Sequence, residues 1–311
     1  MIWREFKALG TEVTITVALE AEQKNVLIAA EQEVLDFEKR FSRFVADSEL
    51  SVLNNSQDTK QKISEIMSEL LMSAKYYYSK TKGIFDPTIL SSLEAIGYNQ
   101  SFDKINSKSD KINLKELAEK FATRSKMDEL KIVGRAVNRP PNFKIDLGGI
   151  GKGYIVDLLG QKFFSDIPNY WISAGGDILA SGCQENGAGW EIGVQNPTKP
   201  DQNIFYIDTS GKKLGIATSG IIKRSGRTGN FKWHHLIDPR TGFPVINDIL
   251  SVTVISSSAM KADILAKTVL IMGEADGLDF IEQENDSACI IFIKNKEPIF
   301  SNRAKTFVKN I

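Results

Sequence analysis

Cysteine, net charge and long apolar stretches are all scarce in this chain of 311 residues. Its two cysteines, Cys183 and Cys289, lie far apart, which excludes a disulfide framework and a CxxC metal site. Lysine plus arginine and aspartate plus glutamate both number 39, so the formal net charge is zero. We therefore expect no general binding to nucleic acid or to anionic membranes, because both need a basic surface.

No targeting or membrane-spanning segment is expected. Residues 1–7, MIWREFK, are not a basic stretch followed by an apolar one, as a secretion signal would be. The apolar runs are shorter than the roughly 20 residues that a transmembrane helix needs. These features predict a cytoplasmic protein, and a trimmed chain is the alternative that the sequence leaves open.

The apolar pattern predicts a mixture of helices and strands. Helices are predicted over residues 21–41, 62–80, 152–164 and 259–272, and a short segment over 47–55 is predicted to be capped by Asp47 or Ser48. The least apolar part, residues 99–130, is predicted to form a surface loop with one exposed helix. Strands are predicted over residues 11–17, 131–137, 142–147, 170–176, 190–195, 203–209, 212–218, 249–256 and 288–294. Because helices and strands do not alternate regularly, an α+β fold is favoured over a doubly wound one.

A glycine-rich turn, DLGGIGKG over residues 146–153, follows a predicted strand and opens a predicted helix. Backbone N–H groups at the start of a helix bind phosphate, and Lys152 adds a positive charge. The P-loop motif is not matched, because Gly153 follows Lys152 where Ser or Thr is required, and GxGxxG is not matched either. A tight structural turn is the alternative interpretation.

Two further small-residue clusters occur at SAGGD, residues 173–177, and ATSG, residues 217–220. Small residues let a ligand or another backbone approach closely, and hydroxyl groups bind phosphate. A β-bulge at the first cluster and a turn at the second are the structural alternatives.

The two histidines of the chain are adjacent, in the segment HHLIDPRTG over residues 234–242. Neighbouring side chains in a strand point to opposite faces, so His234 and His235 are not expected to share a metal. His235 beside the turn that starts at Asp238 suits proton transfer, and a hydrogen-bonded structural histidine is the alternative.

Asp263 lies early in an apolar predicted helix, with Lys267 four residues further on the same face. The pair is either an ordinary ion pair within the helix or part of a site in which the Asp263 carboxylate binds a cation.

Taken together, eight stretches of this chain resemble the ApbE family, the FAD:protein FMN transferases. In chain order they are LGT (9–11), FSRFVADSELSVLN (41–54), GIFDPT (83–88), IDLGGIGKGYIVD (145–157), ISAGGDI (172–178), ATSG (217–220), HHLIDPRTGFPV (234–245) and MKADILAKTVLIMG (260–273). The resemblance implies one large α+β domain over residues 1–311, with mixed, mostly antiparallel sheets and flanking helices around a cleft for FAD. It also implies transfer of FMN from FAD to a Thr or Ser hydroxyl of a separate flavoprotein, with release of AMP.

The resemblance also implies roles for individual residues. His235 is the expected base for the acceptor hydroxyl, and Mg²⁺ is expected to bind the Gly149 carbonyl, the Asp263 carboxylate and the position of Lys267. The positions that match FAD contacts or the phosphate-binding segments are Leu9, Phe44, Asn54, Ile84, Phe85, Asp86, Asp146, Lys152, Gly175, Gly176, Asp177, Thr218, Ser219, Ile237 and Thr241. Asp238 and Thr241 are expected to shape the histidine loop.

One position departs from the family pattern, because the family usually has Thr where this chain has Lys267. A protonated lysine donates hydrogen bonds and cannot bind a cation. Thr268 is rotated from that position by about 100°. Three outcomes follow: water replaces the ligand, the ammonium replaces part of the metal charge, or the protein binds FAD without transferring FMN.

Three alternative functions can be compared with these sequence features. The site of an FAD hydrolase that yields FMN and AMP would look the same. A carrier that binds FAD intact would fit the Lys267 departure. An interaction protein without a ligand would leave the glycine clusters and the histidine loop unexplained.

Overall fold

The structure is a computed structural model that describes residues 1–18, 24–100, 114–228 and 231–309. The chain forms two compact units. Unit 1 consists of Met1–Glu38, Lys152–Ile222 and Asn247–Ile311, and unit 2 of Lys39–Gly151 and Lys223–Ile246. The predicted α+β class with antiparallel sheets and flanking helices is confirmed, since every pairing between described strands is antiparallel.

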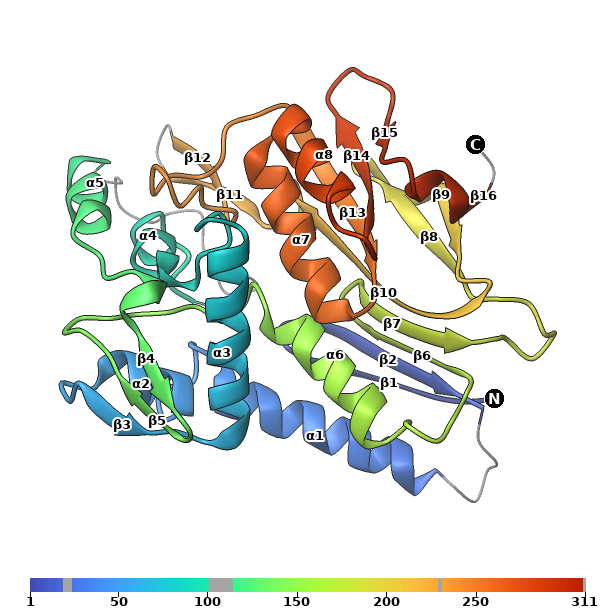
Figure 1. Cartoon of the computed structure of the whole chain (residues 1–311), viewed down its shortest axis with the longest axis horizontal. Coiled ribbons are helices and arrows are strands. Elements are labelled where there is room, and N and C mark those ends of the chain that lie inside the picture. The colour runs from blue at the N-terminus through green and yellow to red at the C-terminus, as the bar shows by residue number, and fades with distance from the viewer. Residues whose placement is uncertain (19–23, 101–113, 229–230, 310–311) are drawn as a thin grey trace. The chain divides into compact units, whose positions relative to one another are not determined.

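Unit 1 is built on an eight-stranded sheet with the order β1-β2-β6-β7-β10-β13-β14-β15 (Figure 1). Its strands are β1 (Ile2–Ala8), β2 (Thr11–Val17), β6 (Tyr170–Ala174), β7 (Asp177–Gly182), β10 (Gly211–Gly220), β13 (Ile249–Ser256), β14 (Ala288–Ile293) and β15 (Ile299–Phe300). A second sheet of three strands has the order β16-β9-β8 and contains β8 (Glu191–Asn196), β9 (Lys199–Asp208) and β16 (Val308–Lys309).

Helices cover one face of the eight-stranded sheet, as Figure 1 shows for α6 and α7. The helices of this unit are α6 (Gly151–Lys162), α7 (Ala259–Met272), α8 (Glu274–Glu282) and the short η5 (Ala304–Thr306), and α1 (Asn25–Phe41) leads from it into unit 2. Apolar side chains of β8 and β9 share a buried cluster with side chains from β7, β10, β13 and β14. The sheet therefore has apolar partners on both of its faces.

Helices α6 and α7 approach each other closely at their N-termini. A Cβ atom on Gly153 would lie 2.5 Å from the Cα atom of Met260, so only glycine fits there. The Asp157 carboxylate of α6 accepts hydrogen bonds from the backbone N–H groups of Ala259 (2.8 Å) and Met260 (2.9 Å). Asp157 thereby satisfies N–H groups that the first turn of α7 leaves without helical partners.

Unit 2 is mostly helical. It contains α2 (Glu49–Asn55), α3 (Glu65–Lys80), η2 (Pro87–Ile89), α4 (Leu90–Ala95), α5 (Leu114–Ala122) and η4 (Met127–Glu129). Its strands are β3 (Lys60–Lys62), β4 (Lys131–Val133) and β5 (Ala136–Asn138) in one sheet, and β11 (Ser225–Thr228) and β12 (Phe231–His234) in a hairpin.

Most predicted elements are confirmed. Strand β2 and helix α7 have the predicted bounds, and Ser48 is the N-cap of α2, with its Oγ accepting from the Ser51 N–H. The start of the helix predicted over 21–41 and much of the loop predicted over 99–130 lie outside the described residues.

Three predictions about local structure are wrong. The strand predicted over 131–137 is a hairpin of β4 and β5, which turns at Gly134 with a φ of +55°. Residues 142–147 form no strand, because the Ile145 backbone N–H and C=O both bond to the Asn54 side chain instead of to another strand. The cluster at 217–220 is not a turn but the end of β10, paired with β13.

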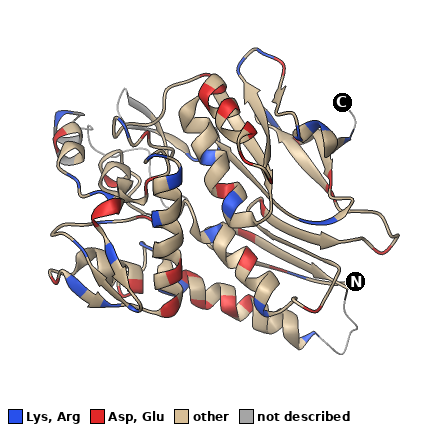
Figure 2. Cartoon of the chain, viewed as in Figure 1, with Lys and Arg blue, Asp and Glu red and all other residues tan. Residues whose placement is uncertain are grey.

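Acidic and basic residues both occur along α3 and α7 in Figure 2. Among the described residues, no helix combines the length and apolarity required to cross a membrane.

Asp157 predicts a pH-dependent contribution to stability. Burial raises the pKa of Asp157 from 3.8 to about 6, although its hydrogen bonds to Met260 and Ala259 act to lower it. Because the folded protein holds this proton more tightly than the unfolded chain, the contribution is present at low pH and is lost as the pH rises through 6. Relative to Asp157→Asn, the wild type should gain about 2 kcal/mol of unfolding free energy between about pH 7.5 and about pH 4.5.

Urea denaturation of both proteins at several pH values measures this difference. Asp166→Asn, at an exposed carboxylate just after α6, is the matched control and should track the wild type at every pH. A constant difference between wild type and Asp157→Asn across this range would contradict the prediction.

Candidate functional site

The predicted site residues fall into two groups, one in each unit. Leu9, Lys152, Gly175, Gly176, Asp177, Thr218, Ser219, Asp263 and Lys267 belong to unit 1. Phe44, Asn54, Ile84, Phe85, Asp86, Asp146, Gly149, His235, Ile237 and Thr241 belong to unit 2. Within each unit, the structure brings most members of the group together.

In unit 1, two hairpin turns lie side by side at one end of the eight-stranded sheet. Leu9 and Gly10 join β1 to β2 with φ values of 58° and 64°, and Gly175 and Gly176 join β6 to β7 with 62° and 94°. The Gly175 N–H donates to the Glu12 carbonyl at 2.9 Å. The cluster at 173–177 is therefore a two-residue hairpin turn, not the β-bulge weighed from its sequence.

Gly175 is required at this turn for two reasons. Its positive φ favours glycine, and a Cβ atom would lie 2.4 Å from the Thr11 Oγ1. The small residues of this predicted phosphate-binding segment therefore have a structural role in the packing of the two turns.

Thr218 and Ser219 lie near the same end of the sheet. Strands β7 and β10 are antiparallel, and Ile178 pairs with Ile216. Asp177 precedes Ile178 and Thr218 comes two residues after Ile216, so both lie toward the same end of the sheet. The Thr218 hydroxyl is 2.8 Å from the hydroxyl of Thr253 on β13. Ser219 is buried, so Thr218 is the more accessible of the two hydroxyl groups.

Four charged side chains gather beside these strand ends. Lys152, in the first turn of α6, forms an ion pair with Asp177, and Lys267 forms one with Asp263 one turn earlier on α7. Burial raises the pKa of Asp177, the negative charge of Asp263 raises it further, and both lysines lower it. We call these four residues the charge quartet.

Asp263 is deeply buried, and one of its carboxylate oxygens makes no hydrogen bond. It is 1% exposed, and its Oδ2 has no hydrogen-bond partner. Its Oδ1 and its backbone carbonyl both accept from the Lys267 ammonium, the latter at 3.3 Å.

These surroundings do not fit the Mg²⁺ expected from the resemblance. Mg²⁺ needs oxygen ligands, and the Lys267 position presents a cation on the same carboxylate that would bind the metal.

In unit 2, Asn54 and Asp146 organise the segment before α6. The Asn54 side chain makes two hydrogen bonds of 2.9 Å with the Ile145 backbone. The next residue, Asp146, forms an ion pair of 2.8 Å with Arg43, and its N–H donates to the Pro87 carbonyl at 2.8 Å. Gly149 follows in the turn just before α6.

Arg43 contacts two aromatic rings, Phe44 and Tyr98, which also contact each other with their centroids 6.0 Å apart. Its guanidinium carbon is 4.3 Å from the ring centroid of Phe44 and 4.7 Å from that of Tyr98, which stacks in turn on Trp233. Phe44 is 40% exposed, so part of its ring is open to contact with another planar group.

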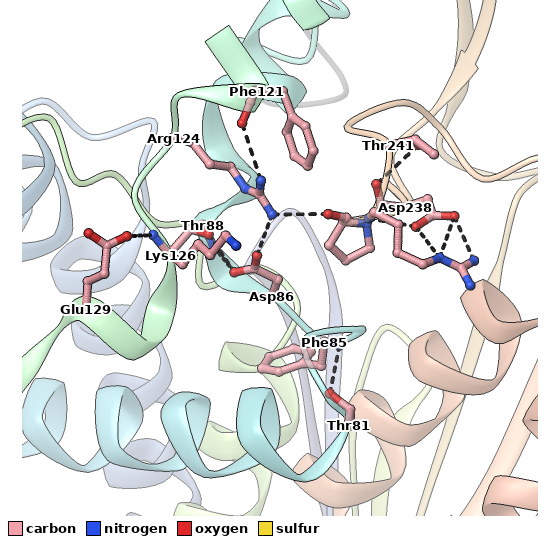
Figure 3. Close-up of polar contacts among 12 residues, drawn as sticks. Thr81, Phe85, Asp86, Thr88, Phe121, Arg124, Lys126, Glu129, Asp238 and Thr241 are labelled. Atoms are coloured by element: carbon pink, nitrogen blue, oxygen red, sulfur yellow. Dashed lines mark hydrogen bonds and ion pairs between the residues drawn. The ribbon is translucent and has the colours of Figure 1, made fainter. Parts of the chain in front are cut away.

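A second arginine, Arg124, joins the segment at 84–88 to the histidine loop (Figure 3). Its Nη2 donates to the Asp86 carboxylate at 3.0 Å and to the Pro239 carbonyl at 3.1 Å. Asp86 is buried, and it also accepts from the Thr88 hydroxyl at 2.6 Å. The centroid of the Phe121 ring lies 3.7 Å from the guanidinium carbon of Arg124.

Ile84 and Phe85 precede Asp86 on this segment. The Phe85 N–H donates to the Thr81 Oγ1 at 2.9 Å (Figure 3), and the Phe85 ring is buried. Phe85 therefore contributes to the core of unit 2 more than to its surface.

The histidine loop forms the predicted turn. The N–H groups of Thr241 and Gly242 donate to the Asp238 carbonyl at 3.1 and 2.8 Å, and the Asp238 carboxylate pairs with Arg240 at 2.8 Å. Ile237 is 1% exposed and packs with Leu93 and Trp233.

The two histidines differ in their surroundings, and β12 ends at His234, so His235 lies just outside the strand. His234 Nε2 lies 3.0 Å from the Val245 carbonyl, and burial lowers the pKa of His234. His235 is half-buried, and its Nδ1 lies 3.3 Å from the Arg224 carbonyl. When Nδ1 carries the ring proton, Nδ1–H donates a hydrogen bond to this carbonyl, and the lone pair of the neutral imidazole is on Nε2.

Arg43 and Arg124 are the residues that the sequence interpretation missed. Arg43 lies inside the stretch FSRFVADSELSVLN, and an arginine beside an aromatic residue was the available signal for it. Arg124 follows a polar region with no motif, so nothing in the sequence indicated its partners.

Comparison with known proteins agrees with this arrangement. The sequence profile of the ApbE family matches residues 9–291, and the chain therefore belongs to the ApbE family. The FAD:protein FMN transferase of Haemophilus influenzae is 27% identical over 281 residues, which cover 88% of this chain and 80% of that protein. That of Vibrio cholerae is 26% identical over 282 residues, covering 89% of this chain and 82% of its relative.

Solved structures of the family have the same fold. The ApbE protein of Thermotoga maritima superposes with a TM-score of 0.87 at 25% identity, covering 99% of both chains. The flavin transferase ApbE of Vibrio cholerae gives a TM-score of 0.82 at 26% identity, covering 98% of both chains.

Arg124 should stabilise unit 2 far more than its exposed neighbour Arg240. Replacement of Arg124 by Met leaves the buried Asp86 carboxylate without a cation, which should lower the free energy of unfolding by about 3 kcal/mol. Arg240→Met is the matched control, because its side chain is 54% exposed and an exposed pair contributes at most about 1 kcal/mol. Urea denaturation measures both, and equal losses would contradict the assignment.

Proposed function

We propose that this chain transfers FMN from FAD to a Thr or Ser hydroxyl of a separate flavoprotein and releases AMP. The observation that carries this proposal is the family match over residues 9–291, which spans both units. Relatives named FAD:protein FMN transferase align over most of their own length. The single domain expected over residues 1–311 stays a prediction, and the family match covers residues 9–291 of it.

The reaction is a phosphoryl transfer with a defined exchange of bonds. The acceptor oxygen forms a bond to the phosphorus that carries the flavin side of FAD, and the bond from that phosphorus to the bridging oxygen breaks. AMP leaves with the bonding electron pair, and the hydroxyl proton passes to a base. Catalysis of this kind depends chiefly on positioning and on charge stabilisation.

His235 is the base that the geometry favours. Its Nδ1 lies 3.3 Å from the Arg224 carbonyl, and a hydrogen bond from Nδ1–H to this carbonyl would place the lone pair of the neutral ring on Nε2. The loop that carries it is held by the Asp238 turn and by the hydrogen bond from Arg124 to the Pro239 carbonyl. His235 can therefore be held in one orientation while an acceptor hydroxyl approaches.

Other side chains are proposed to bind FAD. Phe44 offers an exposed ring for a planar flavin or adenine group, and Asp146, oriented by Arg43, offers a carboxylate for ribose or adenine donors. Lys152 offers a cation for phosphate, although Asp177 already pairs with it. Roles of Leu9, Asn54, Ile84, Phe85, Asp86, Ile237 and Thr241 in binding FAD stay predictions.

Metal dependence is not part of the proposed mechanism. The Lys267 ammonium on the Asp263 carboxylate does not support the expected Mg²⁺ site, so no step is assigned to a metal. A cytoplasmic location likewise stays a prediction.

The transfer reaction predicts an acceptor-dependent release of AMP. Purified protein incubated with FAD and a candidate acceptor should produce AMP and add one FMN to the acceptor, as intact-mass analysis measures. His235→Ala should slow the transfer by about 100-fold or more, because it removes the general base. FAD binding should persist in this variant.

His234→Gln is the matched control, since this neighbouring histidine bonds to the Val245 carbonyl and has no assigned role in the reaction. It should transfer FMN within a few-fold of the wild-type rate. AMP release at the same rate without acceptor would indicate an FAD hydrolase instead. Stoichiometric binding of FAD with no AMP would indicate a carrier.

A further inference from the structure

The four charges of the charge quartet in unit 1 sum to zero without an added ion. It contains two carboxylates, Asp177 and Asp263, and two ammonium groups, Lys152 and Lys267. Asp177 is 2% exposed and Asp263 1% exposed, so bulk water hydrates neither carboxylate. In such a site each negative charge needs a fixed positive partner, and each has one.

Lys267 holds its place by ordinary helix geometry. Residues four apart lie on the same face of a helix, so an extended Lys267 side chain reaches back to Asp263. Its ammonium contacts both the side-chain Oδ1 and the backbone carbonyl of that residue. Two acceptors on one residue hold the ammonium directly at the carboxylate.

A divalent cation at Asp263 would have to compete with this ammonium. It would share the carboxylate with Lys267 and stand near Lys152 in a site largely closed to water, where like charges repel strongly. The unpartnered Asp263 Oδ2 is an acceptor that becomes available to a cation only when the repulsion is removed.

We propose that the Lys267 ammonium is a built-in counter-ion of Asp263 that takes the place of a divalent cation, and that Asp263 binds such a cation only when Lys267 is replaced by a neutral residue. This inference rests on the proposed function in one respect, because the expected transferase site is the reason to consider a divalent cation at Asp263. The pairing of Lys267 with Asp263 is argued from the geometry of the charge quartet alone.

Titration with Mn²⁺, followed by the electron paramagnetic resonance of the free ion, tests the proposal without any transfer reaction. Four proteins are compared: wild type, Asp263→Asn, Lys267→Gln and the double variant. Wild type and Asp263→Asn should give the same curve. Lys267→Gln should gain one site, at least about tenfold tighter than any in the wild type, that the double variant lacks.

Two further variants keep the test decisive. Lys267→Arg retains the charge and should gain no site, and Lys267→Thr replaces Lys267→Gln if the latter does not fold. Mn²⁺ should also raise the melting temperature of the neutral variant but not that of the wild type. A wild-type Mn²⁺ site that depends on Asp263 and matches the affinity of Lys267→Gln overturns the proposal, as does the absence of a site in both neutral variants.

The outcome is independent of the transfer assay. Failure of FMN transfer with the Mn²⁺ results as expected would leave the counter-ion in place and refute the proposed function alone. Normal transfer together with tight wild-type Mn²⁺ binding at Asp263 would refute the counter-ion proposal and leave the proposed function in place.

Discussion

Two lysine–carboxylate ion pairs allow unit 1 to keep four charges at the end of its main sheet. Lys152–Asp177 and Lys267–Asp263 satisfy carboxylates whose burial without partners would cost several kcal/mol each. The approach of α6 to α7 places the pairs near one another, because Gly153 is adjacent to Lys152 and packs on Met260, one turn before Asp263. The packing of two helices therefore determines the electrostatics of the site.

The fold was predictable where a local pattern decides the structure. The alternation at residues 11–17 and the cap at Ser48 depend on neighbouring residues, and both were confirmed. The segment 142–147 has the same kind of apolar pattern, but its backbone bonds to Asn54, about 90 residues earlier in the chain. A hydrogen bond at such sequence separation leaves no mark on the local pattern.

The candidate site was predictable as a set of positions but not as a set of partners. The glycine clusters, the histidine loop and Asp263 were recognised because their residue types are unusual at such spacing. The ion pairs of Asp146 with Arg43, of Asp86 with Arg124 and of Asp177 with Lys152 depend on tertiary contacts. The small residues Gly153 and Gly175, which suggested a phosphate, are explained at least in part by close contacts within the fold.

Anomalous diffraction tests most directly whether the Lys267 ammonium is the counter-ion of Asp263. Crystals grown with FAD and Mn²⁺ would be measured at the manganese absorption edge. The account predicts that the Lys267 ammonium stays on the Asp263 carboxylate and that no manganese peak lies within bonding distance of Asp263. A manganese ion bonded to Asp263, with the Lys267 side chain turned away, would contradict it.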